Sequence, residues 1–228
     1  MKTLGIIGAG DLGKQIADYA INDNHYDGVV FFDDYYDNNT QQNNNKVVGK
    51  LVDIEKAFND KVFDELIIGI GYKHLEFKKK IYEQLKDKIT FGKIIHSSSI
   101  ISESANIEEG CVIYPGCIID INSVIKANTI INIGCTISHD SEVGNHCFLS
   151  PRVAIAGFVK ISNECFLGIN STIIDNIKIS SRVKLGASAV VINSITEEGL
   201  YLGIPAKKHI KKWSHLTNHL SLEMNYNI

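Results

Sequence analysis

The sequence predicts an α/β N-terminal half-domain of the Rossmann-like type, followed by a left-handed parallel β-helix built from hexapeptide repeats. Two observations predict this fold. Near the N-terminus a glycine-rich turn links an apolar strand to an amphipathic helix, and the second half of the chain carries an aliphatic residue at every sixth position. The expected boundaries are 1–93 for the half-domain, 94–206 for the β-helix and 207–228 for a C-terminal tail.

The N-terminal elements follow the order strand, helix, strand, loop, strand, helix, which is half of a Rossmann-type sheet. The strands are expected at 3–8, 29–32 and 66–70, and the helices at 14–22 and from about 75 to 85. Between the last two strands, the polar run Asn38–Asn45 is expected to be a loop without chemistry.

The glycine turn reads GxGxxG from Gly8 to Gly13. Such a turn can hold a phosphate, because the first amides of the following helix point at it. Asp33 lies about 20 residues further on, where a dinucleotide site places its ribose-binding acid. The segment is too short for a complete dinucleotide domain, so a single-nucleotide half-site is favoured. The alternative, that the glycines only serve the tight turn, stays open.

The repeat runs without a gap from residue 101 to residue 196. Its hexads are ISESAN, IEEGCV, IYPGCI, IDINSV, IKANTI, INIGCT, ISHDSE, VGNHCF, LSPRVA, IAGFVK, ISNECF, LGINST, IIDNIK, ISSRVK, LGASAV and VINSIT. The segment 95–100 extends the register backwards by one unit. A fixed period indicates stacked repeats, whereas the strands of a β-sandwich vary in length.

Each hexad is predicted to form one short strand and a corner, so that three hexads close a triangular coil. The aliphatic first residue points inward, and each such burial contributes roughly 1.5–3 kcal/mol. The fifth place is small or β-branched and holds all the cysteines: Cys111, Cys117, Cys135, Cys147 and Cys165. A buried Cys acts as a small hydrophobe, so a core role is favoured over a redox or zinc role.

Composition excludes several classes of function. The net charge of -3 does not indicate a nucleic-acid partner. No apolar stretch reaches the roughly 18 residues that a membrane span needs, and no signal-peptide cleavage pattern follows Met1. We therefore expect a cytoplasmic protein without membrane insertion.

Several motifs together resemble one family: GIIGAGDLG, the FFDD strand end, the hexads, ISHDSEVGNH and LGIPAKK. They resemble the sugar acyltransferases of the sialic acid O-acetyltransferase type, which include bacterial N-acetyltransferases acting on nucleotide-linked 4-amino-4,6-dideoxysugars. The resemblance runs from residue 3 to about residue 207. It implies a homotrimer with active sites between neighbouring β-helices, a nucleotide sugar bound by the N-terminal domain, and acetyl-CoA bound along the helix.

The resemblance implies that His139 is the general base. His139 occupies the third place of its hexad, which is expected to face outward. An imidazole near neutrality can take the proton from an attacking amine or hydroxyl. Asp140 is expected to orient the ring, with Glu142 as an alternative orienter. His146 is a candidate for substrate binding. The family often has a further His where this chain has Phe148.

The remaining site residues also rest on the resemblance. The Gly157 N–H is expected to bond the thioester oxygen, one coil above His139, and direct attack requires no acylated side chain. The other cofactor-binding candidates are Gly186, Ala187, Gly203, Ile204, Pro205, Ala206 and Lys207. Lys207 and Lys208 could meet CoA phosphates or form a solvated basic patch. The candidates for nucleotide-sugar binding are Gly8, Gly10, Asp11 and Gly13 at the phosphates, Asp33 and Asp34 at the base or ribose, and Gly71, Tyr72 and Lys73 on a facing loop.

Three functions are considered. The first is acetyl transfer from acetyl-CoA to the 4-amino group of a nucleotide-linked sugar. The second is O-acetylation of a sugar acid such as sialic acid, which would use the same site. The third is a non-catalytic β-helix that binds a nucleotide or a metal. A metal site is disfavoured, because His139 and His146 are the only histidines inside the hexads.

Overall fold

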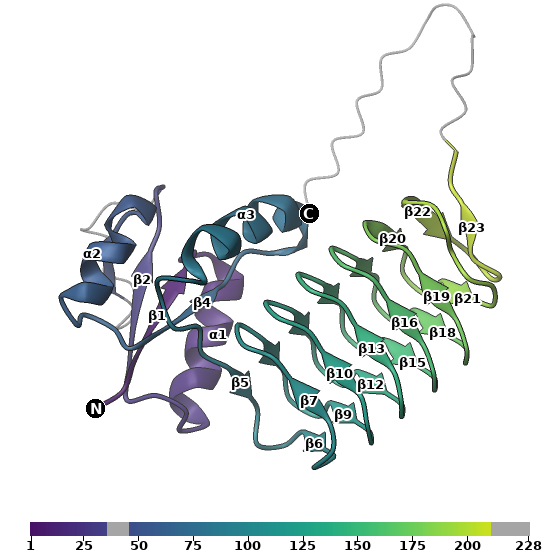
Figure 1. The fold of residues 1–228 in the computed structure, drawn as a ribbon, viewed down its shortest axis with the longest axis horizontal. Helices are drawn as coiled ribbons and strands as arrows, with labels where there is room; N and C mark the ends of the chain where they lie inside the picture. The colour runs from purple at the N-terminus through teal and green to yellow at the C-terminus, as the bar shows by residue number, and fades with distance from the viewer. Residues whose placement is uncertain (36–45, 211–228) are drawn as a thin grey trace, which may run out of the picture.

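The computed structural model describes residues 1–35 and 46–210, so the expected loop at 38–45 and residues 211–228 of the expected tail lie outside the described residues. An α/β part packs beside the first coils of a long column of short strands (Figure 1). The predicted fold class is confirmed: a Rossmann-like half-domain precedes a β-helix.

The N-terminal sheet is parallel and has the strand order β3-β2-β1-β4. Its elements are β1 (Thr3–Ile7), α1 (Asp11–Asn22), β2 (Gly28–Phe32), β3 (Lys46–Gly49), the 3-10 turn η1 (Leu51–Asp53), α2 (Ile54–Asn59), β4 (Glu65–Ile68), the 3-10 turn η2 (Tyr72–His74) and α3 (Leu75–Leu85). Since β1 lies between two other strands, its residues from Leu4 to Ile7 are buried. The short elements β3 and α2 were not predicted from the sequence.

The β-helix has three flat faces, which we name by what covers them. The domain face consists of β5 (Ile94–Ile95), β8 (Val112–Ile113), β11 (Ile130–Ile131), β14 (Phe148–Leu149), β17 (Phe166–Leu167), β20 (Val183–Leu185), β22 (Gly199–Leu202) and β23 (Lys207–Lys208). The apolar face consists of β6 (Ile100–Ile101), β9 (Ile118–Ile119), β12 (Thr136–Ile137), β15 (Ala154–Ile155), β18 (Thr172–Ile173) and β21 (Val190–Val191). The charged face consists of β7 (Asn106–Ile107), β10 (Val124–Ile125), β13 (Glu142–Val143), β16 (Lys160–Ile161) and β19 (Lys178–Ile179).

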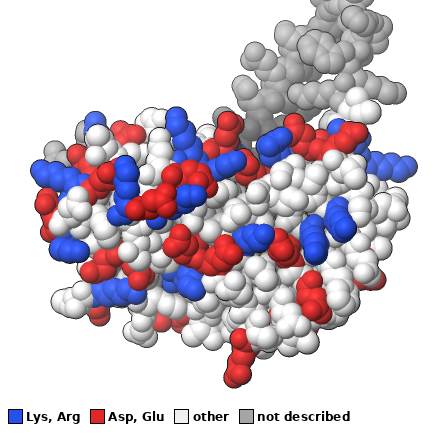
Figure 2. Space-filling model, in the orientation of Figure 1, with Lys and Arg blue, Asp and Glu red and all other residues white. Residues whose placement is uncertain are grey.

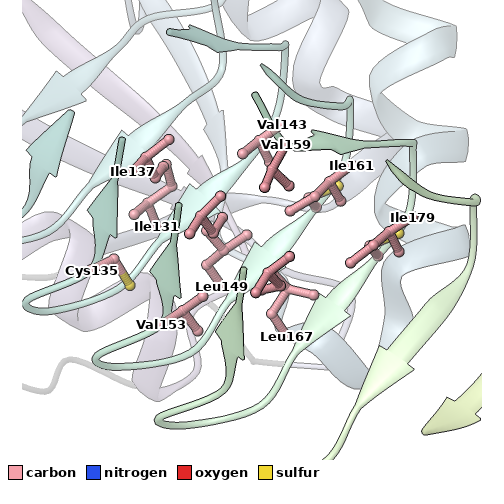
Figure 3. Close-up of a cluster of buried hydrophobic side chains, with 14 of the residues drawn as sticks. Ile131, Cys135, Ile137, Val143, Leu149, Val153, Val159, Ile161, Leu167 and Ile179 are labelled. Atoms are coloured by element: carbon pink, nitrogen blue, oxygen red, sulfur yellow. The ribbon is translucent and has the colours of Figure 1, made fainter. Parts of the chain in front are cut away.

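The core of the column confirms the hexad prediction. Every first-place residue from Ile107 to Val191 is buried, and so is every fifth-place residue from Cys111 to Ile195. Ile137, Val143 and Leu149 point from their strands into the shared interior (Figure 3). All the cysteines are fully buried, and burial raises the pKa of the Cys111 thiol to about 12, so this thiol is a core group and not a nucleophile.

The corners explain which residues occupy the fourth hexad place. From Gly110 to Ser188 this place adopts a left-handed backbone, as at Asn122 (φ 56°), Asp140 (φ 56°) and Arg152 (φ 61°). Such a conformation favours Gly, Asn and Asp and is an outlier for β-branched residues. No hexad has a β-branched residue at its fourth place.

The N-terminal part packs on the first coils of the domain face. Tyr114 is fully buried there and meets Tyr19 of α1 edge to face, with ring centroids 4.9 Å apart. Lys78 of α3 is also fully buried, and its Nζ donates to the Asn128 carbonyl at 2.7 Å. Burial lowers the pKa of Lys78 from 10.5 to about 7, so the junction between the two parts is sensitive to pH.

We expect the free energy of unfolding to rise with pH between about 7 and 10.5. Across this range Lys78 is mostly protonated in the unfolded chain and mostly deprotonated in the folded chain. Replacing Lys78 with Met removes this titration, so thermal unfolding measured from pH 7 to pH 10 should show a flatter dependence on pH. Lys80→Met, an exposed position on the same helix, is the control and should keep the wild-type slope. Equal slopes for Lys78→Met and wild type would contradict the prediction.

Candidate active site

His139 lies at the corner where β12 turns into β13, between the apolar and the charged face. Its side chain points outward, as the third hexad place predicts, and is 42% exposed. We call this position the His139 corner. It brings an imidazole to the surface of the column, where a substrate can reach it.

A short hydrogen-bonded chain orients the imidazole. His139 Nδ1 lies 2.9 Å from Asp140 Oδ2, and the other carboxylate oxygen of Asp140 accepts a bond of 3.1 Å from Asn122 Nδ2. The bond to His139, and after it the bond from Asn122, holds the pKa of Asp140 below its usual value, so this carboxylate is ionised. A carboxylate at Nδ1 favours the tautomer with a proton there, which leaves Nε2 as the base.

Gly157, one coil above, makes room for the ring. A Cβ at Gly157 would lie 2.7 Å from His139 Cε1 and 2.8 Å from Nε2. Phe158 meets the ring edge to face with centroids 5.1 Å apart. In the described part of the chain, the bonds between coils use the Phe158 amide and the Gly157 carbonyl, but not the Gly157 amide. Among the described residues this amide has no bonded partner, so the glycine that lies over the His139 ring keeps a donor available for a developing oxyanion.

His146 lies at a different corner, between the charged and the domain face. It is 3% exposed, its Nδ1 is 3.0 Å from Asn128 Nδ2, and its ring meets Tyr82 of α3 edge to face. Burial lowers its pKa to about 4, so the ring is neutral at neutral pH. One chain does not bring His146 and His139 together, and the contacts of His146 support the packing of α3.

The predicted phosphate-binding glycines fall into two groups. Gly8 has a φ of 99°, and a Cβ at Gly13 would lie 1.9 Å from the Gly8 carbonyl oxygen. These two glycines are required by the turn itself. A Cβ at Gly10 would meet nothing within 4 Å, and one at Gly71 would touch only Leu12 at 4.0 Å. Gly10 and Gly71 therefore border the open side of the turn, where a ligand could approach.

The predicted acidic residues are partly engaged by the protein. Asp33 Oδ2 accepts a bond of 2.8 Å from the Ala9 amide, and Asp34 Oδ1 accepts one of 2.9 Å from the Leu51 amide. Asp11 is exposed in the first turn of α1. Asp33 thus stabilises the glycine turn from the end of the neighbouring strand.

An open groove of about 920 Å³ runs between η2, α3 and the outer coils. Tyr72 and Lys73, both predicted for substrate binding, lie on its wall together with Glu164, Arg182 and Lys184. The Tyr72 ring stacks on Phe166 with centroids 4.5 Å apart. Phe148 lies beneath this pair and is 6% exposed, so the position where the resembled family often has His is part of an aromatic cluster.

Most of the predicted cofactor-binding residues lie at the upper end of the corner between the domain and the apolar face, which we call the cofactor corner. Ala187, Ile204 and Pro205 are exposed there, and the Gly203 carbonyl accepts a bond from the Val190 amide. Ala206 is half-buried, and Lys207 is exposed in β23. Gly186 is covered, because a Cβ there would lie 2.3 Å from Leu202 Cδ2. Lys208 pairs with Glu197 at 2.6 Å.

The two corners bound the same apolar face but are separated by its width. Within one chain, His139 and Gly157 are together, whereas the residues of the cofactor corner are not beside them. In residues 1–35 and 46–210, no group of three His, Cys, Asp or Glu side chains is placed to hold a metal ion. Over the same ranges, no helix is long and apolar enough to cross a membrane.

Comparisons with known proteins agree with this architecture. Residues 3–85 match the family model described as the PglD N-terminal domain. The acetyltransferase domain of PglB from Neisseria gonorrhoeae is 26% identical, with a TM-score of 0.84, and the match covers 92% of this chain and 100% of that one. PerB from Caulobacter crescentus, solved with CoA and GDP-perosamine, is also 26% identical, with a TM-score of 0.82 over 91% and 97% of the two chains. No curated protein sequence matches the chain.

The chain is an acyltransferase. The resemblance to sugar acyltransferases is confirmed, in particular to those that acetylate amino sugars. Sequence reasoning did not identify Asn122 and Phe158, two residues that lie next to the predicted His139–Asp140 pair of the acyltransferase. Both stand 18 residues from Asp140, one coil below and one coil above. Applying the coil period to the predicted site residues would have found them.

Replacing Gly157 with Ala should displace the His139 ring and lower the rate of acyl transfer by about 10²-fold, because a shift of about 1 Å at the reacting group has that effect. The measurement is release of free CoA thiol at saturating substrates. Gly28→Ala is the control, since its Cβ would meet Thr3 at an ordinary 3.6 Å. A Gly157→Ala variant with wild-type turnover would show that the position of the ring does not matter.

Proposed function

We propose that the acyltransferase moves an acetyl group from acetyl-CoA to the 4-amino group of a nucleotide-linked 4-amino-4,6-dideoxysugar. The observation that carries the proposal is the outward-facing His139–Asp140 pair, which lies directly below Gly157, a residue whose amide has no bonded partner in the described part of the chain. Similarity to PerB over 91% of the chain supports the choice of both substrates, because that enzyme was solved with CoA and GDP-perosamine. Similarity to PglB solved with acetyl coenzyme A supports acetyl-CoA as the donor.

The roles of the residues follow from their geometry. As the sugar amine adds to the thioester carbonyl carbon, His139 Nε2 takes a proton from the amine nitrogen, and Asp140 stabilises the imidazolium that forms. The Gly157 N–H donates to the carbonyl oxygen while it carries the negative charge. When the carbon–sulfur bond breaks, the imidazolium gives its proton to the leaving thiolate. The amide product and free CoA result, and His139 is neutral again.

The exposed side chains of the apolar face support a homotrimer as part of this proposal. The face and its two edges carry eight exposed large apolar residues: Ile100, Ile118, Ile121, Ile133, Phe158, Ile169, Ile174 and Ile192. The domain face is instead covered by the N-terminal part, and the charged face carries pairs such as Lys126–Glu142. Acidic and basic side chains intermingle on the surface shown in Figure 2. A large uncovered apolar patch marks an interaction surface.

Threefold closure around the apolar face would complete the site. The His139 corner and the cofactor corner are the two edges of this face, so a ring of three chains sets one edge of each against the other edge of its neighbour. The Gly157 amide and the His139 imidazole of one chain would then border the same groove as residues 187 and 203–207 of the next, which lie higher along the column. The expected cytoplasmic location stays a prediction.

The acceptor is tested with purified protein, acetyl-CoA and a panel of GDP-, dTDP- and UDP-linked 4-amino-4,6-dideoxysugars, with free sialic acid as the O-acetylation candidate. We expect thiol release with an amino sugar, and a loss of 10²–10⁴-fold in kcat for His139→Asn, because a general base contributes about that much. His25→Asn, which removes another surface imidazole, should leave kcat unchanged. Turnover that depends on sialic acid alone, or that survives His139→Asn, would refute the proposal.

The assembly is tested by light scattering after size exclusion. The wild-type protein should have three times the chain mass of 25.3 kDa. Ile133→Glu places a charge on the edge of the apolar face and should shift the protein to monomer with loss of turnover, whereas Lys160→Glu on the charged face should stay trimeric. A wild-type monomer with full activity would exclude a site shared between chains.

A further inference from the structure

Asn122 lies directly below Asp140 in the column, at the same fourth hexad place one coil earlier. Both residues have a φ of 56°, so their side chains leave the corner in the same direction. The Asp140 amide donates to the Ile121 carbonyl at 3.0 Å, and the Asn122 amide donates to Ser104 Oγ at 3.0 Å. The backbone therefore fixes where the Asn122 side chain can reach.

The two oxygens of Asp140 have different donors. Oδ1 accepts from Asn122 Nδ2 at 3.1 Å, and Oδ2 is 2.9 Å from His139 Nδ1. A carboxylate held by one donor can rotate about its last torsion, which is broad for Asp. With a donor at each oxygen, rotation would break both bonds. The Asn122 amide therefore presents Oδ2 to the imidazole and favours the proton at Nδ1.

We propose that Asn122 is a positioning residue for His139, acting through Asp140 to hold the tautomer and the direction of Nε2. The kinetic consequence of this role rests on the proposed function, but the orientation of the ring does not.

The charged residues around Asn122 make it a suitable position at which to test how a new charge affects the Asp140–His139 pair. Among the described residues, Asp140 is the charged side chain that contacts the ring. The coils below and above contribute Asp120, whose Oδ1 accepts from the Ile121 amide, and Lys160; Glu142 on the next strand pairs with Lys126. Gly157 and Phe158, which touch the ring from above, are uncharged. A new carboxylate at position 122 would therefore act on the Asp140–His139 pair without a cation paired to it beforehand.

The first test requires no substrate. Imidazole nitrogen shifts of the ¹⁵N-histidine-labelled trimer, with His139 assigned through His139→Asn, report its tautomer and titration. Asn122→Ala should lower the fraction of the Nδ1–H tautomer at high pH, and Asn122→Asp should make the ring titrate at higher pH than in the wild type, because a second carboxylate favours the imidazolium. The controls are Asn106→Ala and Asn106→Asp, an exposed position on the charged face at the base of the column, and these should leave the ring unchanged. A His139 that keeps its tautomer and its titration in both Asn122 variants would overturn the proposal.

The second test measures the catalytic consequence. Asn122→Ala should lower kcat about 10- to 100-fold with little change in KM for either substrate, since it disturbs the base and not the binding surfaces. In an Asp140→Asn background, the same substitution should cause no further loss, because Asn122 then has no ionised carboxylate to orient. Independent, additive losses would show that Asn122 does not act through Asp140. If no acceptor is found at all, the proposed function fails, and the imidazole titration still decides the role of Asn122.

Discussion

The inward stacking of first-place aliphatic side chains is the constraint on which the whole acyltransferase depends. Because three hexads close one coil, residues 18 positions apart lie directly above one another. This rule puts Gly157 over His139 and Asn122 under Asp140. The site is therefore assembled by the column, without any long loop, from residues that are far apart in sequence but adjacent along its axis.

The three faces share one backbone and differ only in their outward residues. On the domain face these are Val112, Ile130 and Phe148, which pack against the N-terminal part; on the charged face they include Glu142 and Lys160. On the apolar face nothing within the described chain covers Ile118. In a single chain the apolar face is therefore exposed, and its two edges carry the predicted catalytic and cofactor residues. If further copies of the chain bury this face, catalysis would depend on assembly.

Sequence periodicity was sufficient for the column, its core and its buried cysteines, because each depends on local pattern alone. It was not sufficient where tertiary packing decides. The fourth place of a hexad faces outward, yet α3 buries His146 there. The GxGxxG pattern does not separate Gly13, which the turn needs, from Gly10, which borders open space. Likewise, the position of Asp33 at a strand end indicated a ligand contact, but it did not indicate that the carboxylate also accepts a bond from the Ala9 amide of the glycine turn.

Phe148 stands where the resembled family often has a histidine, and in the proposed mechanism this leaves one imidazole for the chemistry. Phe148 is packed under Tyr72 and Phe166, and its hydrocarbon ring has no proton acceptor. His146, the other histidine of the hexads, is buried and has a pKa of about 4, and its ring contacts α3 rather than the His139 corner. In the proposed mechanism, proton transfer therefore falls to His139, and its rate would depend on how well Asp140, Asn122 and Gly157 hold a ring that is still 42% exposed.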